Sequence, residues 1–186
     1  YSSEWNSNDL GEIVGGIASG DLGGSNDYLV VGTSGDSRNN NEVSGEVIVY
    51  KRSGGTYTTD GAAIDSERYR AYGLAVADVD NDGETEIAVG TGDFGDAKPT
   101  ITVYEGSSRS IEYSKTVDTS SVWGVAADDF DSDGFGELIY GTSGGEIFLY
   151  DGETEDFEAK TSALSGKAGH YGGIAIGNID NEGPKE

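Results

Sequence analysis

The chain has 186 residues, of which 34% are hydrophobic and 10% aromatic, and it contains 31 glycines but no cysteine. This composition indicates a globular protein with many turns, and it excludes a disulfide framework, thiol chemistry and disorder throughout the chain. The formal net charge of −24 argues against nucleic acid and anionic membranes as partners, and the absence of an apolar run of about eighteen residues argues against membrane insertion.

Residues 14–66 are predicted to form the first of several similar units. A short strand of small residues, Gly16–Ala18, precedes an apolar strand, Tyr28–Thr33, that ends in Gly-Thr. A third strand, Val47–Tyr50, ends in tyrosine, and a poorer fourth strand follows around Tyr57. These runs are short, rich in β-branched and aromatic residues and separated by polar turns, which is typical of antiparallel strands.

The same order of strands recurs along the rest of the chain. The second unit, residues 71–118, has strands at Gly73–Ala75, Glu86–Thr91, Ile101–Tyr104 and around Tyr113. The third unit, residues 122–165, has strands at Gly124–Ala126, Glu137–Thr142, Ile147–Tyr150 and around Phe157. An incomplete fourth unit, residues 171–186, begins with Gly173–Ala175.

A repeat of about fifty residues with four antiparallel strands predicts the blades of a β-propeller, in which alanine fits the crowded strand near the axis. We therefore expect an all-β fold, a single propeller segment over residues 1–186 with three blades and the start of a fourth. That number does not close a ring of roughly four to eight blades. The remainder of a longer chain or neighbouring subunits are expected to complete it, and a longer chain is favoured because an open blade edge needs cover.

An acidic loop joins the first and second strands of two units. It reads Asp-Val-Asp-Asn-Asp-Gly-Glu-Thr-Glu from Asp78 to Glu86 and Asp-Phe-Asp-Ser-Asp-Gly-Phe-Gly-Glu from Asp129 to Glu137. Acids at alternate positions direct oxygens into a tight loop, glycine permits the bend, and the next residue offers its backbone carbonyl. Such an oxygen cage suits calcium better than magnesium, and a chain with one histidine and no cysteine does not favour zinc.

The predicted calcium ligands are the first, third, fifth, seventh and ninth residues of each loop. They are Asp78, Asp80, Asp82, Glu84 and Glu86 in one loop and Asp129, Asp131, Asp133, Phe135 and Glu137 in the other. A third loop supplies Asn178, Asp180, Glu182, Pro184 and Glu186, and a degenerate loop in the first unit offers Asp21, Ser25 and Asp27. We expect weak binding in the degenerate loop because Gly23 and Ser25 stand where the other loops have acids. The alternative interpretation is that these are ordinary turn residues, but their repetition at matched places favours calcium.

The residues around the acidic loops are similar to a known repeat. A small residue and an alanine precede each loop, as in Gly73-Leu74-Ala75, and Glu-Ile or Glu-Leu and then Gly-Thr follow it. This pattern resembles the FG-GAP or VCBS repeat of integrin-α-like propellers over nearly the whole chain. The phenylalanine-glycine of that family is replaced by Tyr72-Gly73 and Trp123-Gly124, and its final Gly-Ala-Pro is Gly-Thr here. The resemblance implies calcium-binding blades that serve adhesion or recognition.

The expected calcium sites suggest where the protein works. Extracellular calcium modules bind with affinities of about 10⁻⁴ to 10⁻³ M and fill only where calcium is millimolar, so we expect a secreted or cell-surface protein. The 35 acidic residues greatly outnumber the 11 basic residues, and three calcium ions would offset only about six charges. The remaining surface acid is also typical of a halophilic source, where salt screens the repulsion.

Ligands are expected on the face opposite the acidic loops. The candidate contact residues are Arg70, Tyr72, Trp123, His170, Tyr171 and Arg38. Aromatic and cationic side chains suit a sugar or a peptide carboxylate. The alternative is that Tyr72 and Trp123, which replace the phenylalanine of the family, pack between blades.

Three functions are consistent with these features. The favoured one is a calcium-stabilised extracellular module that binds a protein or glycan ligand. The second is the propeller domain of a polysaccharide lyase or glycoside hydrolase, although no set of nucleophile, base and orienting residue is recognisable and no catalytic residue is assigned. The third is a structural subunit of an extracellular surface assembly or filament.

Overall fold

The computed structural model describes most of the chain. The described residues are 5, 10, 12–23, 26–34, 45–65, 70–92, 98–117, 120–129, 131–154, 156–161 and 173–176. Within them the chain forms strands and turns, and no helix in them has the length and hydropathy needed to span a bilayer. Outside the described residues lie Arg38, His170, Tyr171, Ser25 and the third predicted loop with Asn178, Asp180, Glu182, Pro184 and Glu186.

Blade 1 is the first antiparallel sheet. Its strands are β1 (Val14–Gly20), β2 (Tyr28–Thr33), β3 (Glu46–Ser53) and β4 (Thr56–Thr59), paired in that order. A short strand, β5 (Ile64–Asp65), pairs with the opposite end of β3. The sequence pattern predicted four strands here but not β5.

Blades 2 and 3 repeat the four-strand order. Blade 2 has β6 (Arg70–Ala77), β7 (Glu86–Gly92), β8 (Thr100–Glu105) and β9 (Ile111–Thr116). Blade 3 has β10 (Val122–Asp128), β11 (Glu137–Thr142), β12 (Ile147–Asp151) and β13 (Asp156–Lys160). Within each blade the four strands pair antiparallel in sequence order, so the predicted all-β, four-stranded blades are confirmed.

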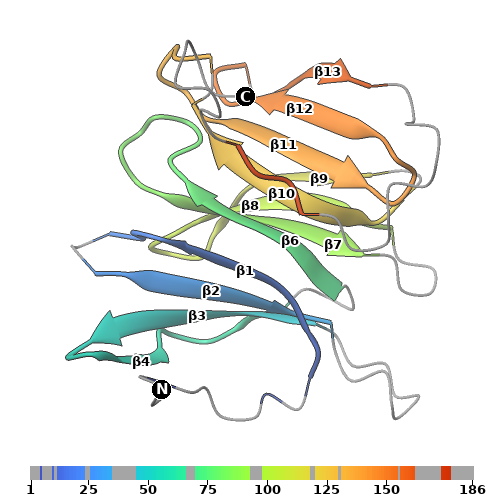
Figure 1. The fold of residues 1–186 in the computed structure, drawn as a ribbon. Coiled ribbons are helices and arrows are strands. Elements are labelled where there is room, and N and C mark those ends of the chain that lie inside the picture. The colour runs from blue at the N-terminus through green and yellow to red at the C-terminus, as the bar shows by residue number, and fades with distance from the viewer. Residues whose placement is uncertain are drawn as a thin grey trace.

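The three blades follow one another and meet along their first strands, β1, β6 and β10 (Figure 1). Small residues make this close approach possible. A Cβ atom on Gly16 would collide with the carbonyl oxygen of Tyr72, and one on Gly73 would lie 2.7 Å from Cγ2 of Val125. Glycine at these places lets the backbones of neighbouring blades touch, as expected for strands near a propeller axis.

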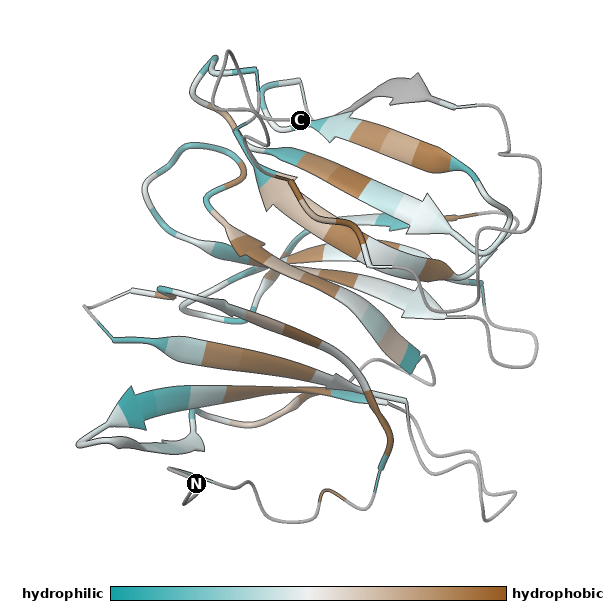
Figure 2. Cartoon of the chain, viewed as in Figure 1, coloured by the Kyte–Doolittle hydropathy of each residue, from teal (hydrophilic) through white to brown (hydrophobic). Residues whose placement is uncertain are grey.

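Two hydrophobic cores hold the blades together, one between blades 1 and 2 and one between blades 2 and 3. Hydrophobic residues colour the middle of the strands brown in Figure 2. Leu74 of β6 and Val125 of β10 are 8% and 5% exposed because each faces the preceding blade. Ile17, at the matching position of β1, is 63% exposed, because no blade precedes β1 among the described residues.

Candidate metal centres and axial pocket

The acidic loop of blade 2 is held by hydrogen bonds from its own backbone. Asp78 Oδ2 accepts from the Gly83 amide at 3.2 Å, and Asp80 Oδ1 accepts from the Asp82 amide at 3.1 Å. Asp82 Oδ1 accepts from the Glu84 amide at 2.8 Å. These bonds turn the first two aspartates toward the centre of the loop.

The acidic loop of blade 3 has the same geometry. Asp129 Oδ2 accepts from the Gly134 amide at 3.2 Å, Asp131 Oδ1 from the Asp133 amide at 3.1 Å, and Asp133 Oδ1 from the Phe135 amide at 2.8 Å. The glycines of both loops have positive φ, 90° at Gly83 and 104° at Gly134, which is the conformation that the predicted bend requires. The two sequences therefore form one local structure twice.

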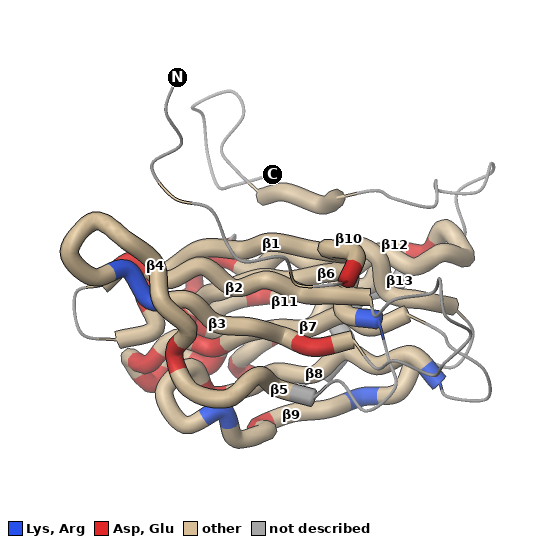
Figure 3. Tube along the Cα trace, turned by 90° about the horizontal axis from the view of Figure 1, so that it is seen from below, with Lys and Arg blue, Asp and Glu red and all other residues tan. Residues whose placement is uncertain are grey.

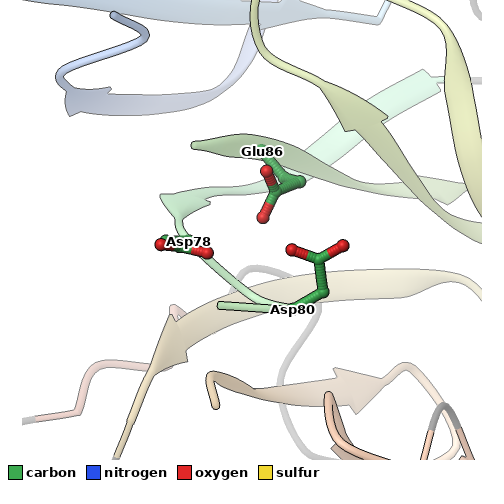
Figure 4. Close-up of side chains that lie close together, drawn as sticks. All are labelled: Asp78, Asp80 and Glu86. Atoms are coloured by element: carbon green, nitrogen blue, oxygen red, sulfur yellow. The ribbon is translucent and has the colours of Figure 1, made fainter. Parts of the chain in front are cut away.

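Each loop brings three carboxylates together. One oxygen each of Asp78, Asp80 and Glu86 lie within 4.8 Å of one another (Figure 4), and a second group consists of Asp129, Asp131 and Glu137. Acidic segments accordingly gather at one end of the sheets in Figure 3. Glu86 and Glu137, at the start of β7 and β11, are only 1% and 2% exposed. Both occupy the ninth position of their loop, which is one of the five positions predicted from the sequence to supply ligands.

Not every predicted ligand belongs to these groups. Asp82 and Asp133 are exposed and lie outside the groups of three. Each instead accepts a hydrogen bond from the amide of the seventh residue, Glu84 or Phe135. Their main visible role in the structure is to shape the turn.

The donor atoms fit a hard cation. Asp78 Oδ1 and Asp129 Oδ1 are buried without a hydrogen-bond partner, and so is Glu86 Oε1. A buried carboxylate oxygen that lacks a partner is costly unless a cation or proton satisfies it. Oxygen-only donors at both loops match the preference of calcium, and the residues present therefore fit that ion.

The close carboxylates change the acidity of blade 2. Burial raises the pKa of Glu86 to about 8; the hydrogen bond from the Val79 amide opposes this shift, while the charges of Glu112, Asp80 and Asp78 add to it. Burial also raises the pKa of Glu112 to about 7, with further contributions from Glu105 and Asp80. Without a cation, protons partly neutralise this group at pH 7.

Blade 1 has a different arrangement at the same place. Asp21 Oδ1 accepts from the Gly23 amide at 2.9 Å, and Asp27 forms an exposed ion pair with Arg52 at 3.1 Å. Tyr28 occupies the register position that Glu86 has in blade 2, and the Lys51 ammonium lies 5.5 Å from the centre of the Tyr28 ring. A lysine thus stands near the place where the other blades gather acids.

Two acidic residues of this region were missed by the sequence analysis. Glu105, at the end of β8, and Glu112, in β9, each place one carboxylate oxygen within 4.8 Å of Glu86 and of each other. The available signal was an acid directly after the tyrosine of the third strand, as at Glu105 and Asp151. Strand register explains the places of Glu105 and Asp151, because Glu105 pairs with Glu86 and Asp151 pairs with Glu137.

A second candidate site is a cavity of about 270 Å³ lined by the first strands of all three blades and by residues 173–174. The rings of Tyr72 and Trp123 stack there, with centroids 4.6 Å apart and planes at 8°. Both residues lie at irregularities of their strands, since the register shifts between Ala71 and Gly73 and between Val122 and Gly124. Such bulges redirect side chains, and here they stack the two rings across neighbouring blades.

Of the other predicted ligand-face residues, Arg70 lies beside this pair and donates a hydrogen bond from Nη1 to the Tyr72 hydroxyl at 3.1 Å. The stack shows that Tyr72 and Trp123 pack between blades, and both also line the cavity. The two interpretations of these residues are therefore compatible. Arg70 contacts Tyr72 without being among the residues that line the cavity.

Comparison with known proteins supports the fold. No family model and no curated protein matches the sequence. The structure is similar to that of the RRP9 WD40 repeats, with TM-score 0.52 and 10% identity over 83% of this chain and 39% of that one. It is also similar to the Dos1 propeller, with TM-score 0.59 and 14% identity over 87% of this chain and 39% of that one. The chain thus spans well under half the length of these propellers, and its own fold is that of a β-propeller segment.

Proposed function

We propose that the chain is a calcium-stabilised part of an extracellular β-propeller that binds a protein or glycan ligand. The observation that carries the calcium assignment is the matched pair of unpartnered buried oxygens, Asp78 Oδ1 and Asp129 Oδ1. They occupy the same position in two loops whose hydrogen bonds are also the same. Leaving the same buried oxygen without a hydrogen-bond partner in two loops costs free energy twice, and this is expected where a bound ion coordinates the oxygen in each loop.

Calcium is proposed as a structural ion. The loops join strands within a blade, and the groups of three carboxylates lie where a bound ion would hold the ends of these strands together. An ion that binds only the folded chain stabilises it by mass action, by about 1 kcal/mol for each site at a few times its dissociation constant. Such sites fill where calcium is millimolar, which supports an extracellular location.

The axial cavity is the proposed ligand site. Tyr72 and Trp123 offer aromatic surface, and Arg70 lies next to Tyr72. Sugar rings pack on aromatic faces and carboxylates pair with arginine, so a glycan or a peptide is the ligand class that this chemistry suits.

Further blades are proposed to cover the open side of blade 1. Ile13, Val14 and Ile17 are 50%, 46% and 63% exposed, whereas the matching residues Leu74 and Val125 are buried by the preceding blade. Apolar side chains that neighbour a β-sheet edge are usually covered. The rest of a longer chain or neighbouring subunits are the proposed cover.

Calcium titration of chelator-treated protein tests the proposal. Calorimetry at low and high salt, with thermal melting in parallel, is expected to show calcium uptake by both loops and a higher melting temperature. Asp78→Asn and Asp129→Asn are each expected to remove one site. Failure of the unaltered protein to take up calcium would overturn the assignment, and binding of glycans or peptides would then be tested without it.

A further inference from the structure

The acidic group of blade 2 extends beyond its loop. Glu86 belongs to two groups of three carboxylates, one with Asp78 and Asp80 and one with Glu105 and Glu112. Glu86 is only 1% exposed, and its Oε1 atom has no hydrogen-bond partner. A buried and unpartnered oxygen thus stands where the two groups meet.

The strands fix the second group as firmly as the loop fixes the first. Glu105 faces Glu86 because the two residues are register partners between β7 and β8. Glu112 is the extra residue of an irregularity in β9, where Ile111 pairs with Tyr104 and Tyr113 with Val103. A bulge of this kind redirects a side chain, and it accounts for the presence of the Glu112 carboxylate beside the other two.

A small cavity lies beside Glu112 of the second group and Asp80 of the first. It has a volume of about 50 Å³ and is lined by residues that include Asp80, Glu112, Tyr113 and Tyr150. A space of at least about 10–15 Å³ holds a water molecule, so the cavity has room for water that completes the coordination of an ion. Calcium takes six to eight oxygen ligands and commonly accepts water among them.

Charge balance also calls for more than one ion. The two groups together contain five carboxylates, namely Asp78, Asp80, Glu86, Glu105 and Glu112. One divalent cation in the loop offsets about two of these charges, and like charges about 4 Å apart repel by roughly 4 kcal/mol at a protein-surface dielectric. A second divalent cation would offset about two of the remaining three charges, and shared protons are the alternative.

We propose that blade 2 holds two calcium ions, one in the acidic loop and a second between Glu86, Glu105 and Glu112, with the Glu86 carboxylate bridging both. This inference rests on the proposed calcium loop and adds a site outside it. The second ion ties β8 and β9 to the start of β7, so the outer strands of the blade depend on calcium as well as the loop.

The second site distinguishes blade 2 from its neighbours. In blade 1 the positions of Glu86 and Glu105 carry Tyr28 and Lys51, whose ammonium group lies over the ring. In blade 3 the position of Glu105 carries Asp151, whose Oδ1 accepts a hydrogen bond from the Thr154 amide at 2.9 Å. Among the described residues, only blade 2 gathers a second group of three acids.

The test is a count of bound calcium by equilibrium dialysis at saturating calcium. Glu105→Gln/Glu112→Gln is expected to bind one ion fewer per chain than the unaltered protein. Glu153→Gln, an exposed acid of the β12–β13 turn, is the control and should lose none. Asp129→Asn should lose only the ion of blade 3, which shows that the count resolves single sites.

The outcomes separate this inference from the proposed function. Equal counts for the double variant and the unaltered protein would overturn the second site and favour shared protons between Glu105 and Glu112. Absence of calcium from the unaltered protein would overturn the loop assignment and the second site together. If the double variant does not fold, the single change at exposed Glu112, Glu112→Gln, is used. It should weaken binding of the last ion at least tenfold, and unchanged binding would overturn the proposal.

Terbium gives a second readout because it replaces calcium and is excited through nearby tyrosines. Tyr113 and Tyr150 line the cavity beside Glu112, so an ion in the second site should show tyrosine-sensitised emission. In a terbium titration, Glu112→Gln is expected to lose most of the emission that appears when the last ion binds. Retention of that component would overturn the proposal.

Discussion

The amide of Gly136 donates a hydrogen bond to the carbonyl oxygen of Val79 at 2.9 Å, and so joins the acidic loops of blades 3 and 2. The amide of Val79 in turn donates to Glu86 Oε2 at 2.6 Å. Val79 therefore contacts a ligand residue of its own loop through its N–H group and the neighbouring loop through its C=O group. Gly136 directly precedes Glu137, the last acid of the blade 3 loop. A change in either loop is expected to reach the other through this single residue.

Gly136→Ala tests this link. A Cβ atom there would lie 2.7 Å from the carbonyl oxygen of Asp78 and 3.0 Å from Cα of Val79, both of which are backbone atoms. The loops must move apart, and overpacking of this kind typically costs about 1–3 kcal/mol. We expect a lower melting temperature in calcium and weaker binding at the blade 2 loop, although the change lies in blade 3.

Gly173→Ala is the matched control for that variant. A Cβ atom on Gly173 would meet nothing within 4 Å, so its effect on melting should be within about 0.5 kcal/mol. Equal melting temperatures and equal calcium affinities for the two alanine variants would show that the loops are not linked through Val79.

Glu86→Gln is expected to act differently with and without calcium. The pKa of Glu86 is about 8 in the ion-free protein, so this residue is mostly protonated at pH 7, and glutamine resembles the protonated acid. The amide oxygen of glutamine also accepts the Val79 hydrogen bond. In chelator the change should cost less than about 1 kcal/mol, whereas in calcium the variant should bind at least tenfold more weakly, a loss of about 1.4 kcal/mol or more. A large loss of stability in chelator would contradict the assigned role.

The raised pKa of Glu86 also predicts a pH dependence. The pKa of Glu86 rises from its usual 4.5 to about 8 on folding, so the folded state holds more protons than the unfolded state between these values. The stability contributed by this group is therefore present below pH 4.5 and is lost as pH rises toward 8. Urea unfolding of the ion-free protein at pH 5 and pH 8 measures the change, and the same experiment on Glu86→Gln removes the contribution of this group. An equal pH response of the two proteins would rule out this origin.

Calcium binding should release the proton that Glu86 holds. At pH 7 uptake by blade 2 is expected to release about one to two protons, because Glu86 and Glu112, with pKa values of about 8 and about 7, must be ionised to bind calcium. Calorimetry in buffers with different ionisation enthalpies measures this release. The number should fall toward zero well above pH 8, and Glu153→Gln, an exposed acid outside both loops, should leave it unchanged.

The repeated parts of the molecule could be predicted from the sequence alone. The alternation of aspartates from Asp78 to Glu86 fixes both the turn and its inward oxygens, because these depend on residues close in sequence. Glu105 and Glu112 could not be assigned in the same way. They reach Glu86 through the register of β8 and an irregularity in β9, which are properties of strand pairing across a turn. Likewise, the stack of Tyr72 on Trp123 depends on how two blades meet.

Blade 1 is expected not to bind calcium at the strength of the other blades. Tyr28 replaces the buried glutamate, Lys51 lies over its ring, and Asp27 pairs with Arg52. Asp21→Asn should therefore leave the number of bound calcium ions unchanged and the stability within about 0.5 kcal/mol, since the amide oxygen of asparagine can still accept from the Gly23 amide. Loss of a bound ion in equilibrium dialysis would contradict this expectation.

The aromatic stack of the axial cavity is open to a double-mutant cycle. Stacked rings contribute about 0.5–1.5 kcal/mol beyond the area they bury, and Tyr72 and Trp123 lie 4.6 Å apart with planes at 8°. Tyr72→Ala and Trp123→Ala should each destabilise the protein, and the double variant should lose about 1 kcal/mol less than the sum of the two. Trp123→Phe keeps a ring in place and should retain most of the coupling. Strict additivity would show that the two rings fill space independently, and the cavity would then owe its shape to the glycine-rich strands alone.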